Sequence, residues 1–254
     1  NGSMRSLQAA QNITSAIKRD KEQYLRSWYE YSEKQNKQSP SVSPARFFSE
    51  LRNQLNGDAY LVADDGNHTF LTAELMPIHQ SKHFICPSDF NCMGYCVPAA
   101  IACKLAHPEQ QVVGIVGDGA LMMTAMELVT ATTQELGLVM FVFNDGELSQ
   151  ISQAQSIPYN RKTCTVLGGL NIKGVADATG ADYRRIESNE DIATTIPEAL
   201  ALTLQNKPVV VDVNIDYSKA TRFTQGVVAA NLKRFSQKDK ARFIGRALKR
   251  KVTG

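Results

Sequence analysis

The sequence lacks any apolar run long enough to cross a membrane. Its longest run covers residues 138–143, far below the roughly 20 residues that span a bilayer, so we expect no transmembrane helix. The N-terminus does not have the basic stretch followed by an apolar one that is typical of a secretory signal. Five cysteines in 254 residues do not predict a secreted protein built on disulfides. We therefore expect a cytoplasmic protein.

The sequence also shows little excess of one charge. Lys and Arg number 28 and Asp and Glu 25, which leaves a net charge of +3, and 43% of residues are hydrophobic. This composition is typical of a globular chain and excludes disorder. Residues 231–254 differ, with nine Lys or Arg and one acid. Scattered apolar residues predict a basic amphipathic helix there, which we interpret as a solvated or subunit-packing helix. No nucleic-acid motif accompanies it, so we predict neither a nucleic-acid nor a membrane partner.

Three parts of the chain are predicted from composition. Residues 1–44 begin with Asn-Gly-Ser before Met4, which we interpret as a tag scar, and continue through a polar helical remnant into a linker, QNKQSPSVSP. Residues 45–220 form the main domain. Residues 221–254 form the basic helical tail.

Within the main domain, short apolar segments alternate with helical ones. Strands are predicted at 60–63, 112–116, 138–143, 183–186 and 209–215, and helices at 44–56, 98–106, 121–135, 172–179 and 191–205. Continuously apolar strands separated by helices predict an α/β fold: a three-layer, doubly wound parallel sheet with helices on both faces. Ligands of such sheets bind beyond the carboxyl ends of the strands.

A polar turn follows the strand at 112–116. Its residues are Gly117, Asp118, Gly119 and Ala120. The glycines allow a ligand to approach the backbone closely, and the start of the next helix favours a phosphate. A carboxylate beside a phosphate requires a cation between them, and Mg²⁺ or Ca²⁺ prefers oxygen ligands of this kind.

A second polar turn follows the strand at 138–143. It contains Asn144, Asp145, Gly146 and Glu147, and neighbouring parallel strands would bring it beside Asp118. Together the two turns predict a diphosphate held by a divalent cation at this edge of the sheet.

The stretch from Gly117 through Asp145 resembles the thiamine diphosphate (ThDP) motif, which begins Gly-Asp-Gly and ends Asn-Asn. The flanking segments agree: Asp65-Gly66-Asn67-His68, Met93-Gly94-Tyr95, Val97-Pro98-Ala99-Ala100-Ile101-Ala102 and Glu127-Leu128. Over residues 45–220 the chain resembles the diphosphate-binding domain of ThDP-dependent enzymes, in the branch of acetolactate synthase and its relatives. The resemblance implies the ThDP-binding fold.

The resemblance also implies roles for particular residues. Asp118, Asp145 and the Glu147 carbonyl would hold Mg²⁺, and the other cofactor contacts would come from Asn67, His68, Asn91, Met93, Gly117, Gly119 and Ala120. Met93 would prop ThDP into its bent form, although packing in the core is an alternative role for this side chain. Asp145 stands where the family usually has Asn, so either Asn144 or Asp145 could supply the side-chain ligand.

At the level of function, the resemblance implies an enzyme that decarboxylates a 2-oxo acid and transfers or releases the aldehyde unit. The activating Glu of the family belongs to a separate pyrimidine-binding domain, and we expect that domain elsewhere, in the same longer polypeptide or in another subunit. This chain alone should then contain no catalytic residue and be inactive, and the complete enzyme should be a homo-oligomer. The alternatives are a non-catalytic ThDP-fold module, or a subunit of a two-component decarboxylase or oxidoreductase.

Overall fold

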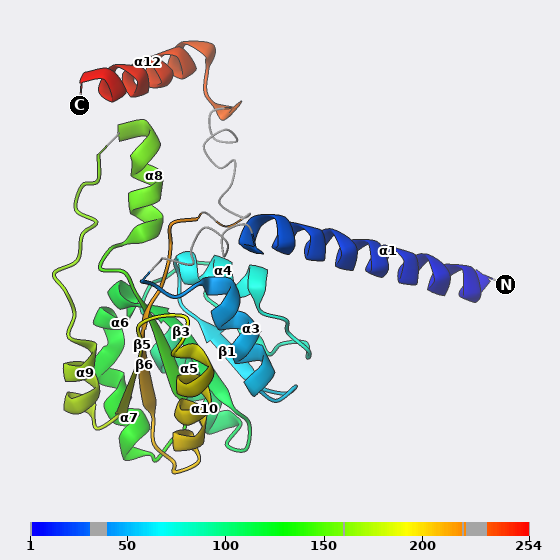
Figure 1. Cartoon of the computed structure of the whole chain (residues 1–254), viewed down its shortest axis with the longest axis vertical. Coiled ribbons are helices and arrows are strands. Elements are labelled where there is room, and N and C mark those ends of the chain that lie inside the picture. Colours follow the sequence, from blue (N-terminus) through cyan, green and yellow to red (C-terminus); the bar gives the residue numbers. More distant parts are fainter. Residues whose placement is uncertain (1, 31–39, 160, 220, 222–232, 254) are drawn as a thin grey trace.

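The computed structural model describes residues 2–30, 40–159, 161–219, 221 and 233–253. At its centre is a six-stranded sheet in the order β2-β1-β3-β4-β6-β5, in which every pair of neighbours is parallel (Figure 1). The strands are β1 (Tyr60–Ala63), β2 (Phe84–Ile85), β3 (Val112–Gly117), β4 (Val139–Asn144), β5 (Asp182–Ile186) and β6 (Val209–Asn214). The predicted α/β parallel sheet is therefore confirmed.

The central strands are apolar throughout because both of their faces are covered. Every residue of β3, β4 and β6 is buried except the last one, as expected for a parallel sheet between two helical layers. The strand register pairs Gly117 with Phe143 and Asn144 with Asn214. The polar turns after β3 and β4 therefore leave the sheet side by side.

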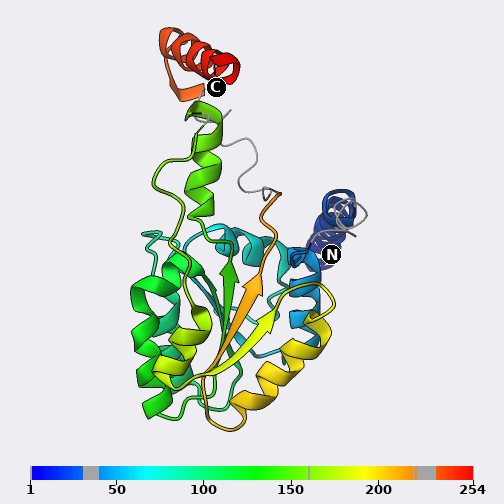
Figure 2. The ribbon, with the colours of Figure 1, turned by 60° about the vertical axis from the view of Figure 1, so that its left-hand side comes forward.

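Helices form a layer on each face of the sheet (Figure 2). One face is covered by α3 (Pro44–Gln54), α4 (Asn67–Leu75) and α10 (Ile192–Thr203), and the other by α5 (Cys96–Ala106), α6 (Asp118–Thr124), α7 (Leu128–Thr133) and α9 (Ile172–Thr179). On the first face, Phe47 of α3 makes edge-to-face contacts with Phe141 and Phe143 of β4, at ring-centroid distances of 5.1 and 5.0 Å. Such aromatic pairs add to the stability that burial provides.

Several elements differ from those predicted. The single helix expected at 121–135 is wrong, because α6 and α7 are separated by a 3₁₀ turn, η2 (Ala125–Glu127). The helix expected from Pro98 begins two residues earlier, at Cys96, so that Pro98 lies in the first turn, where its missing N–H costs nothing. Helix α4 and the short strand β2 have no counterpart among the predicted elements.

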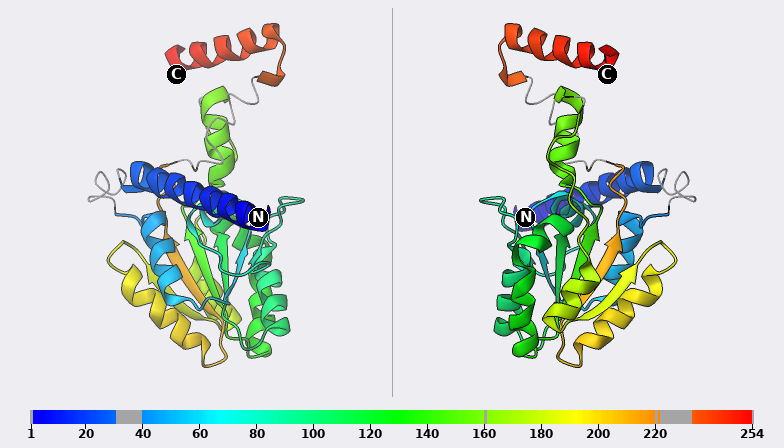
Figure 3. Two further views of the ribbon diagram at one scale, coloured as in Figure 1. Left: turned by 90° about the vertical axis from the view of Figure 1, so that its right-hand side faces the viewer. Right: turned by 90° about the vertical axis from the view of Figure 1, so that its left-hand side faces the viewer.

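Four helical elements lie outside the two layers. Helix α1 (Gly2–Leu25) extends away from the sheet (Figure 1) and passes into a π-helical turn, η1 (Arg26–Glu30), whose Tyr29 and Trp28 pack on the core. Helix α8 (Ser149–Tyr159) stands beyond the carboxyl ends of the strands, and α12 (Gln237–Thr253) lies against it (Figure 3). A helix therefore occurs within the basic tail, and the bounds of the tail at 221–254 stay a prediction.

The predictions for the linker, the tail, membrane-spanning helices and the cysteines compare with the structure as follows. Half of the linker expected at 35–44, residues 35–39, and residues 222–232 of the tail lie outside the described residues. No described helix is both long enough and apolar enough to cross a bilayer. The five cysteines are free thiols.

Candidate cofactor site

The polar turns at the carboxyl ends of β1, β3 and β4 meet around a cavity of about 80 Å³. Every predicted cofactor residue except Asn91 lines this cavity. The lining consists of Asp65, Gly66, Asn67, His68, Met93, Gly117, Asp118, Gly119, Ala120, Phe143, Asp145, Glu147, Leu148, Ser149, Gln150, Ile151 and Tyr217. The sequence prediction thus brought together residues that lie up to 80 positions apart, from Asn67 to Glu147.

Asp118 connects the two polar turns. Its Oδ1 accepts the backbone N–H of Gly119 at 2.8 Å, and its Oδ2 accepts the N–H of Gly146 at 2.9 Å. The side chain is 3% exposed. Asp145 lies in the same turn as Gly146, and its carboxylate accepts a hydrogen bond from the Ser149 hydroxyl of α8. The two carboxylates that were predicted to hold a cation therefore share one buried wall of the cavity.

The electrostatics of this wall favour a cation. Burial raises the pKa of Asp118 to about 6, with a further contribution from the negative charge of Asp145. Burial also raises the pKa of Asp145, against the effect of its bond from Ser149. A nearby positive charge would stabilise the ionised forms of both carboxylates. Oxygen ligands of this type suit Mg²⁺ or Ca²⁺.

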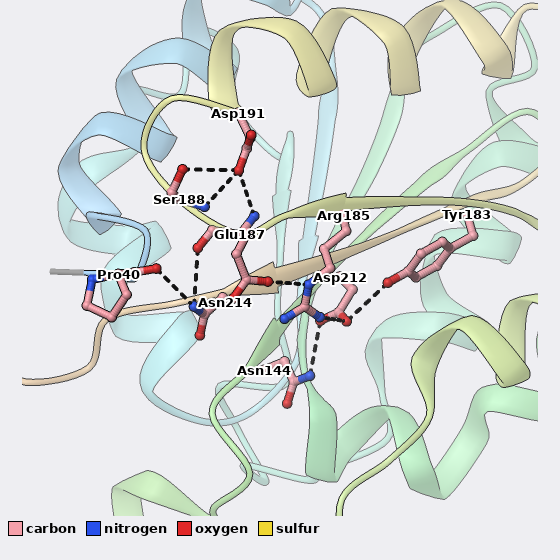
Figure 4. Close-up of polar contacts among 9 residues, drawn as sticks. All are labelled: Pro40, Asn144, Tyr183, Arg185, Glu187, Ser188, Asp191, Asp212 and Asn214. Atoms are coloured by element: carbon pink, nitrogen blue, oxygen red, sulfur yellow. Dashed lines mark hydrogen bonds and ion pairs between the residues drawn. The ribbon is translucent and has the colours of Figure 1, made fainter.

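Asn144 faces away from this wall. Its Nδ2 donates to Asp212 Oδ1 at 3.1 Å on the opposite face of the sheet (Figure 4). Successive residues of a strand point to opposite faces, so Phe143 and Asn144 cannot both face the cavity. Of the two alternatives left open for the side-chain ligand, only Asp145 lines the cavity.

The contacts of Asp212 tie the three strands beside the site together. Asp212 of β6 pairs with Arg185 of β5 and lies 3.4 Å from the Tyr183 hydroxyl, and Asn214 Nδ2 donates to the Glu187 carbonyl at 3.2 Å (Figure 4). Asp212 is 4% exposed. A buried carboxylate needs such partners. This network fixes the direction of the Asn144 side chain at the end of β4.

Glu147 presents two different groups. Its carboxylate pairs with Lys162 at 2.7 Å and accepts the Ser152 hydroxyl at 2.8 Å, and these bonds hold the pKa of Glu147 below its usual range. The carboxylate is therefore already satisfied within the chain. The Glu147 backbone is held by a bridge to Val166, and its carbonyl is the group that the family resemblance implies as a metal ligand.

The loop that carries Met93 is organised by Asp64, which the sequence prediction missed. Asp64 is fully buried, and its two oxygens accept the backbone N–H groups of Gly94 at 2.9 Å and Cys96 at 2.7 Å. These bonds place half-buried Met93 at the cavity. The signal was available, because Asp64 directly follows β1 and so occupies the carboxyl end of a strand.

His68 lies at the start of α4 with its ring almost completely buried, at 4% exposure. Burial lowers its pKa to about 3, so the imidazole is neutral. Its Nε2 has no hydrogen-bond partner among the described residues. The neighbouring Gly66 has φ 152°, and a Cβ there would lie only 2.6 Å from His68 Cε1, so this position requires glycine. Asn67, at 7% exposure, completes this part of the wall.

The remaining predicted residues are placed as follows. A Cβ at Gly119 would lie 2.8 Å from Leu148 Cδ2, so a side chain there would require Leu148 to move. The Gly119 N–H is bonded to Asp118, so it becomes available to a diphosphate only when Asp118 turns to another partner. Asn91 is exposed, with φ 50°, and its N–H donates to the Pro87 carbonyl at 2.7 Å.

Tyr217 was also missed by the sequence prediction. It follows β6 and lines the cavity, and its hydroxyl oxygen is buried with no partner among the described residues. Burial raises the pKa of Tyr217 well above its usual value, and the charges of Asp145 and Asp118 add to this. As with Asp64, its position beyond the carboxyl end of a strand was the available signal.

These features fit a diphosphate held by a divalent cation. The cavity contains the buried carboxylate of Asp118, the half-buried carboxylate of Asp145 and a glycine backbone. It also contains two buried polar atoms without a hydrogen-bond partner among the described residues, His68 Nε2 and Tyr217 Oη. Among the described residues, no group of three His, Cys, Asp or Glu side chains could hold a metal. A cation at this site would therefore need backbone or ligand oxygens as well, as the sequence predicted.

Comparison with known proteins decides the family. The model of the thiamine pyrophosphate enzyme C-terminal TPP-binding domain matches residues 64–213. The chain therefore belongs to the thiamine pyrophosphate enzymes. The match begins at Asp64 and ends within β6, so this family domain contains all ten predicted cofactor residues.

The curated relatives identify the branch. The chain is 31% identical over 180 residues to the acetolactate synthase large subunit of Haemophilus influenzae, covering 70% of this chain and 31% of that protein. It is 29% identical over 205 residues to acetolactate synthase isozyme 3 large subunit of Escherichia coli, covering 77% and 36%. The chain thus spans about a third of the length of these relatives. The predicted resemblance to the acetolactate synthase branch is confirmed.

The fold agrees with a solved structure. A thiamine diphosphate-dependent 4-hydroxybenzoylformate decarboxylase of Rhodococcus jostii RHA1 superposes with a TM-score of 0.65 at 22% identity, covering 72% of this chain and 34% of that one. This similarity supports the ThDP-binding fold of a thiamine pyrophosphate enzyme.

Proposed function

We propose that this chain is the diphosphate- and Mg²⁺-binding domain of an enzyme that decarboxylates a 2-oxo acid and transfers or releases the resulting aldehyde unit. The observation that carries the proposal is the pair of carboxylates, Asp118 and Asp145, on one wall of the cavity, linked through the bond from Gly146 to Asp118. The similarity to acetolactate synthases supports the reaction class.

The chain's own residues have distinct tasks in this proposal. Asp118, Asp145 and the Glu147 carbonyl would hold Mg²⁺, and Met93 would support the cofactor rings from the loop that Asp64 fixes. His68 and Asn67 would face the diphosphate. When bound, ThDP supplies the carbon nucleophile that attacks the carbonyl of the 2-oxo acid. Neutral His68 and the apolar side chains of Leu148 and Ile151 would limit the access of water to this end of the site.

Replacing Asp118 tests the proposal directly. Calorimetry with ThDP and Mg²⁺ should show cation-dependent binding by the unaltered chain and no such binding by Asp118→Ala, while circular dichroism shows that the fold survives. Asp177→Ala is the matched control, since Asp177 lies on α9 and pairs with Lys173 at the surface. Undiminished affinity in Asp118→Ala would refute the assignment of the metal site.

We also propose that catalysis needs a pyrimidine-binding domain besides this chain, in the same longer polypeptide or in a separate subunit. The chain spans about a third of the acetolactate synthases that it matches. The purified 254-residue chain should therefore release no CO₂ from pyruvate or other 2-oxo acids above the rate of ThDP in buffer. Turnover by the chain alone would contradict this proposal. A cytoplasmic location and a homo-oligomeric enzyme stay predictions.

A further inference from the structure

Tyr217 places a hydroxyl at the candidate site that none of the family-derived assignments uses. It lies three residues beyond the end of β6, on the segment that closes the cavity beside β4. The ring packs against the aromatic core, with its centroid 6.4 Å from that of Phe143. The hydroxyl is therefore carried by a packed ring rather than by a free surface side chain.

The backbone around Tyr217 is fixed from two sides. Ile215 forms a parallel bridge with Val42, and the N–H of Asp216 donates to the Val42 carbonyl at 3.0 Å. From the other side, Gln153 of α8 donates through Nε2 to the Tyr217 carbonyl at 3.2 Å. These contacts hold the ring at the cavity wall without using its hydroxyl.

The hydroxyl has no acceptor within the described part of the chain, although two carboxylates are close by. Both oxygens of Asp118 accept backbone N–H groups, from Gly119 and Gly146, and Asp145 accepts the Ser149 hydroxyl. Tyr217 Oη is nevertheless buried and unpartnered. Burying a hydroxyl without a hydrogen bond costs free energy, so its position indicates an acceptor that the chain does not provide.

We propose that the Tyr217 hydroxyl donates a hydrogen bond to a diphosphate oxygen of the bound cofactor. This inference rests on the proposed function and adds a positioning residue to it. A phosphate oxygen supplies the missing acceptor, and a neutral donor adds no charge to a wall that already contains two carboxylates. A hydrogen bond to a charged acceptor is also stronger than one between neutral groups.

The test compares Tyr217→Phe with the unaltered chain by calorimetry and by thermal unfolding. Mg²⁺ with ThDP and Mg²⁺ with inorganic pyrophosphate serve as the two probes. Tyr60→Phe is the matched control, because Tyr60 is the first residue of β1, at the opposite end of the sheet, where its ring stacks on His83 and His107. That variant removes the same atom and keeps the ring.

We expect Tyr217→Phe to raise the Kd of both probes about tenfold or more and to reduce the increase in unfolding temperature that each probe causes. Without a probe, its unfolding temperature should stay the same or rise, since the lost hydroxyl had no partner. Tyr60→Phe should change neither Kd.

Three results would overturn the inference. The first is an unchanged Kd in Tyr217→Phe, and the second is a loss confined to ThDP with pyrophosphate binding unaffected, which would place the contact elsewhere on the cofactor. The third is a marked fall in the unfolding temperature of the probe-free variant, which would reveal a structural partner. If the unaltered chain binds neither probe, the proposed function fails and this inference fails with it, which is a distinguishable outcome.

Discussion

The N–H of Gly146 donates to Asp118 Oδ2 over 2.9 Å, although 28 residues separate the two in sequence. This bond joins the turn after β3 to the turn after β4 and so fixes Asp145 beside Asp118. The consequence is a concentration of negative charge where an anionic diphosphate is proposed to bind. A cation must offset that charge, and the site should therefore depend on the cation more strongly than a site with one carboxylate.

Asp145→Asn tests this dependence. The change removes one negative charge from a proposed Mg²⁺ ligand and keeps an oxygen atom, so the cation should be held less tightly. ThDP binding should then need a higher Mg²⁺ concentration, by about threefold to tenfold, which corresponds to roughly 0.7–1.4 kcal/mol. Calorimetry at a series of Mg²⁺ concentrations measures the shift. Thermal unfolding of the ligand-free variant should occur at a higher temperature, because burial and neighbouring charge disfavour the ionised Asp145.

Glu147→Gln is the control for the general loss of an acid in this turn. Its carboxylate is occupied by Lys162 and Ser152, so the Mg²⁺ requirement should stay close to that of the unaltered chain. An Asp145→Asn variant with an unchanged Mg²⁺ requirement would show that Asp145 does not face the cation.

The sequence was sufficient to predict five of the six strands and to bring together most residues of the candidate site. Buried parallel strands are continuously apolar, and the turns at their carboxyl ends must meet, so Asp118 and Asp145 could be placed together before any coordinates. Tertiary contacts decided the rest. The direction of Asn144 depends on its bond to Asp212, which comes from a strand 68 residues later. The break in the predicted helix at Ala125 carries no Gly or Pro signal. Tyr217 resembles an ordinary loop residue until the cavity is seen.

Asp64→Asn should destabilise the chain. The two Asp64 oxygens accept the N–H groups of Gly94 and Cys96. An Asn side chain has only one oxygen, so its NH₂ group would face one of these two N–H groups. One buried backbone donor would lose its acceptor, at a cost of about 1–3 kcal/mol in the free energy of unfolding. Urea denaturation measures this change. Asp58→Asn, in the loop before β1, should leave stability within about 0.5 kcal/mol of the original; equal stability of the two variants would contradict the organising role of Asp64.

Burial of His68 should make the stability of the chain depend on pH. Burial lowers its pKa from 6.5 to about 3, so the unfolded chain takes up a proton at this residue at a higher pH than the folded chain does. Its contribution to stability is fully present above pH 6.5 and is lost as the pH falls toward 3, with a slope of up to about 1.4 kcal/mol per pH unit. Carboxylates with raised pKa values, such as Asp118, act in the opposite direction over the same range, so the comparison must be made between variants.

The measurement is the difference in unfolding free energy between the unaltered chain and His68→Gln, from pH 8 to pH 4. The two proteins can differ in unfolding free energy at pH 8. As the pH falls below about 6.5, the unaltered chain should lose stability relative to His68→Gln. His79→Gln is the control, because His79 is exposed, and its difference should not vary in this way. A constant difference for His68→Gln across the range would show that the folded chain protonates His68 as readily as the unfolded one.

Truncation of Met93 can distinguish a role in holding the cofactor from a role in core packing. The side chain is half-buried, contacts the apolar core beside β3 and lines the cavity, with its Cε 3.6 Å from where a Cβ of Gly119 would stand. A fully buried methionine would lose about 2–5 kcal/mol on truncation to Ala, whereas this one should lose about 1–2 kcal/mol because part of it already faces the cavity.

In the enzyme assembled with its pyrimidine-binding domain, Met93→Ala should lower turnover at least tenfold while the unfolding temperature falls only modestly. Met93→Leu should be mild in both respects, since its volume is roughly conserved. Met123→Ala removes the same atoms from an exposed methionine of α6, and its turnover should remain close to that of the original enzyme. If Met93→Ala instead loses 2–5 kcal/mol of stability while the folded enzyme keeps normal turnover, Met93 is a core residue and has no part in holding the cofactor.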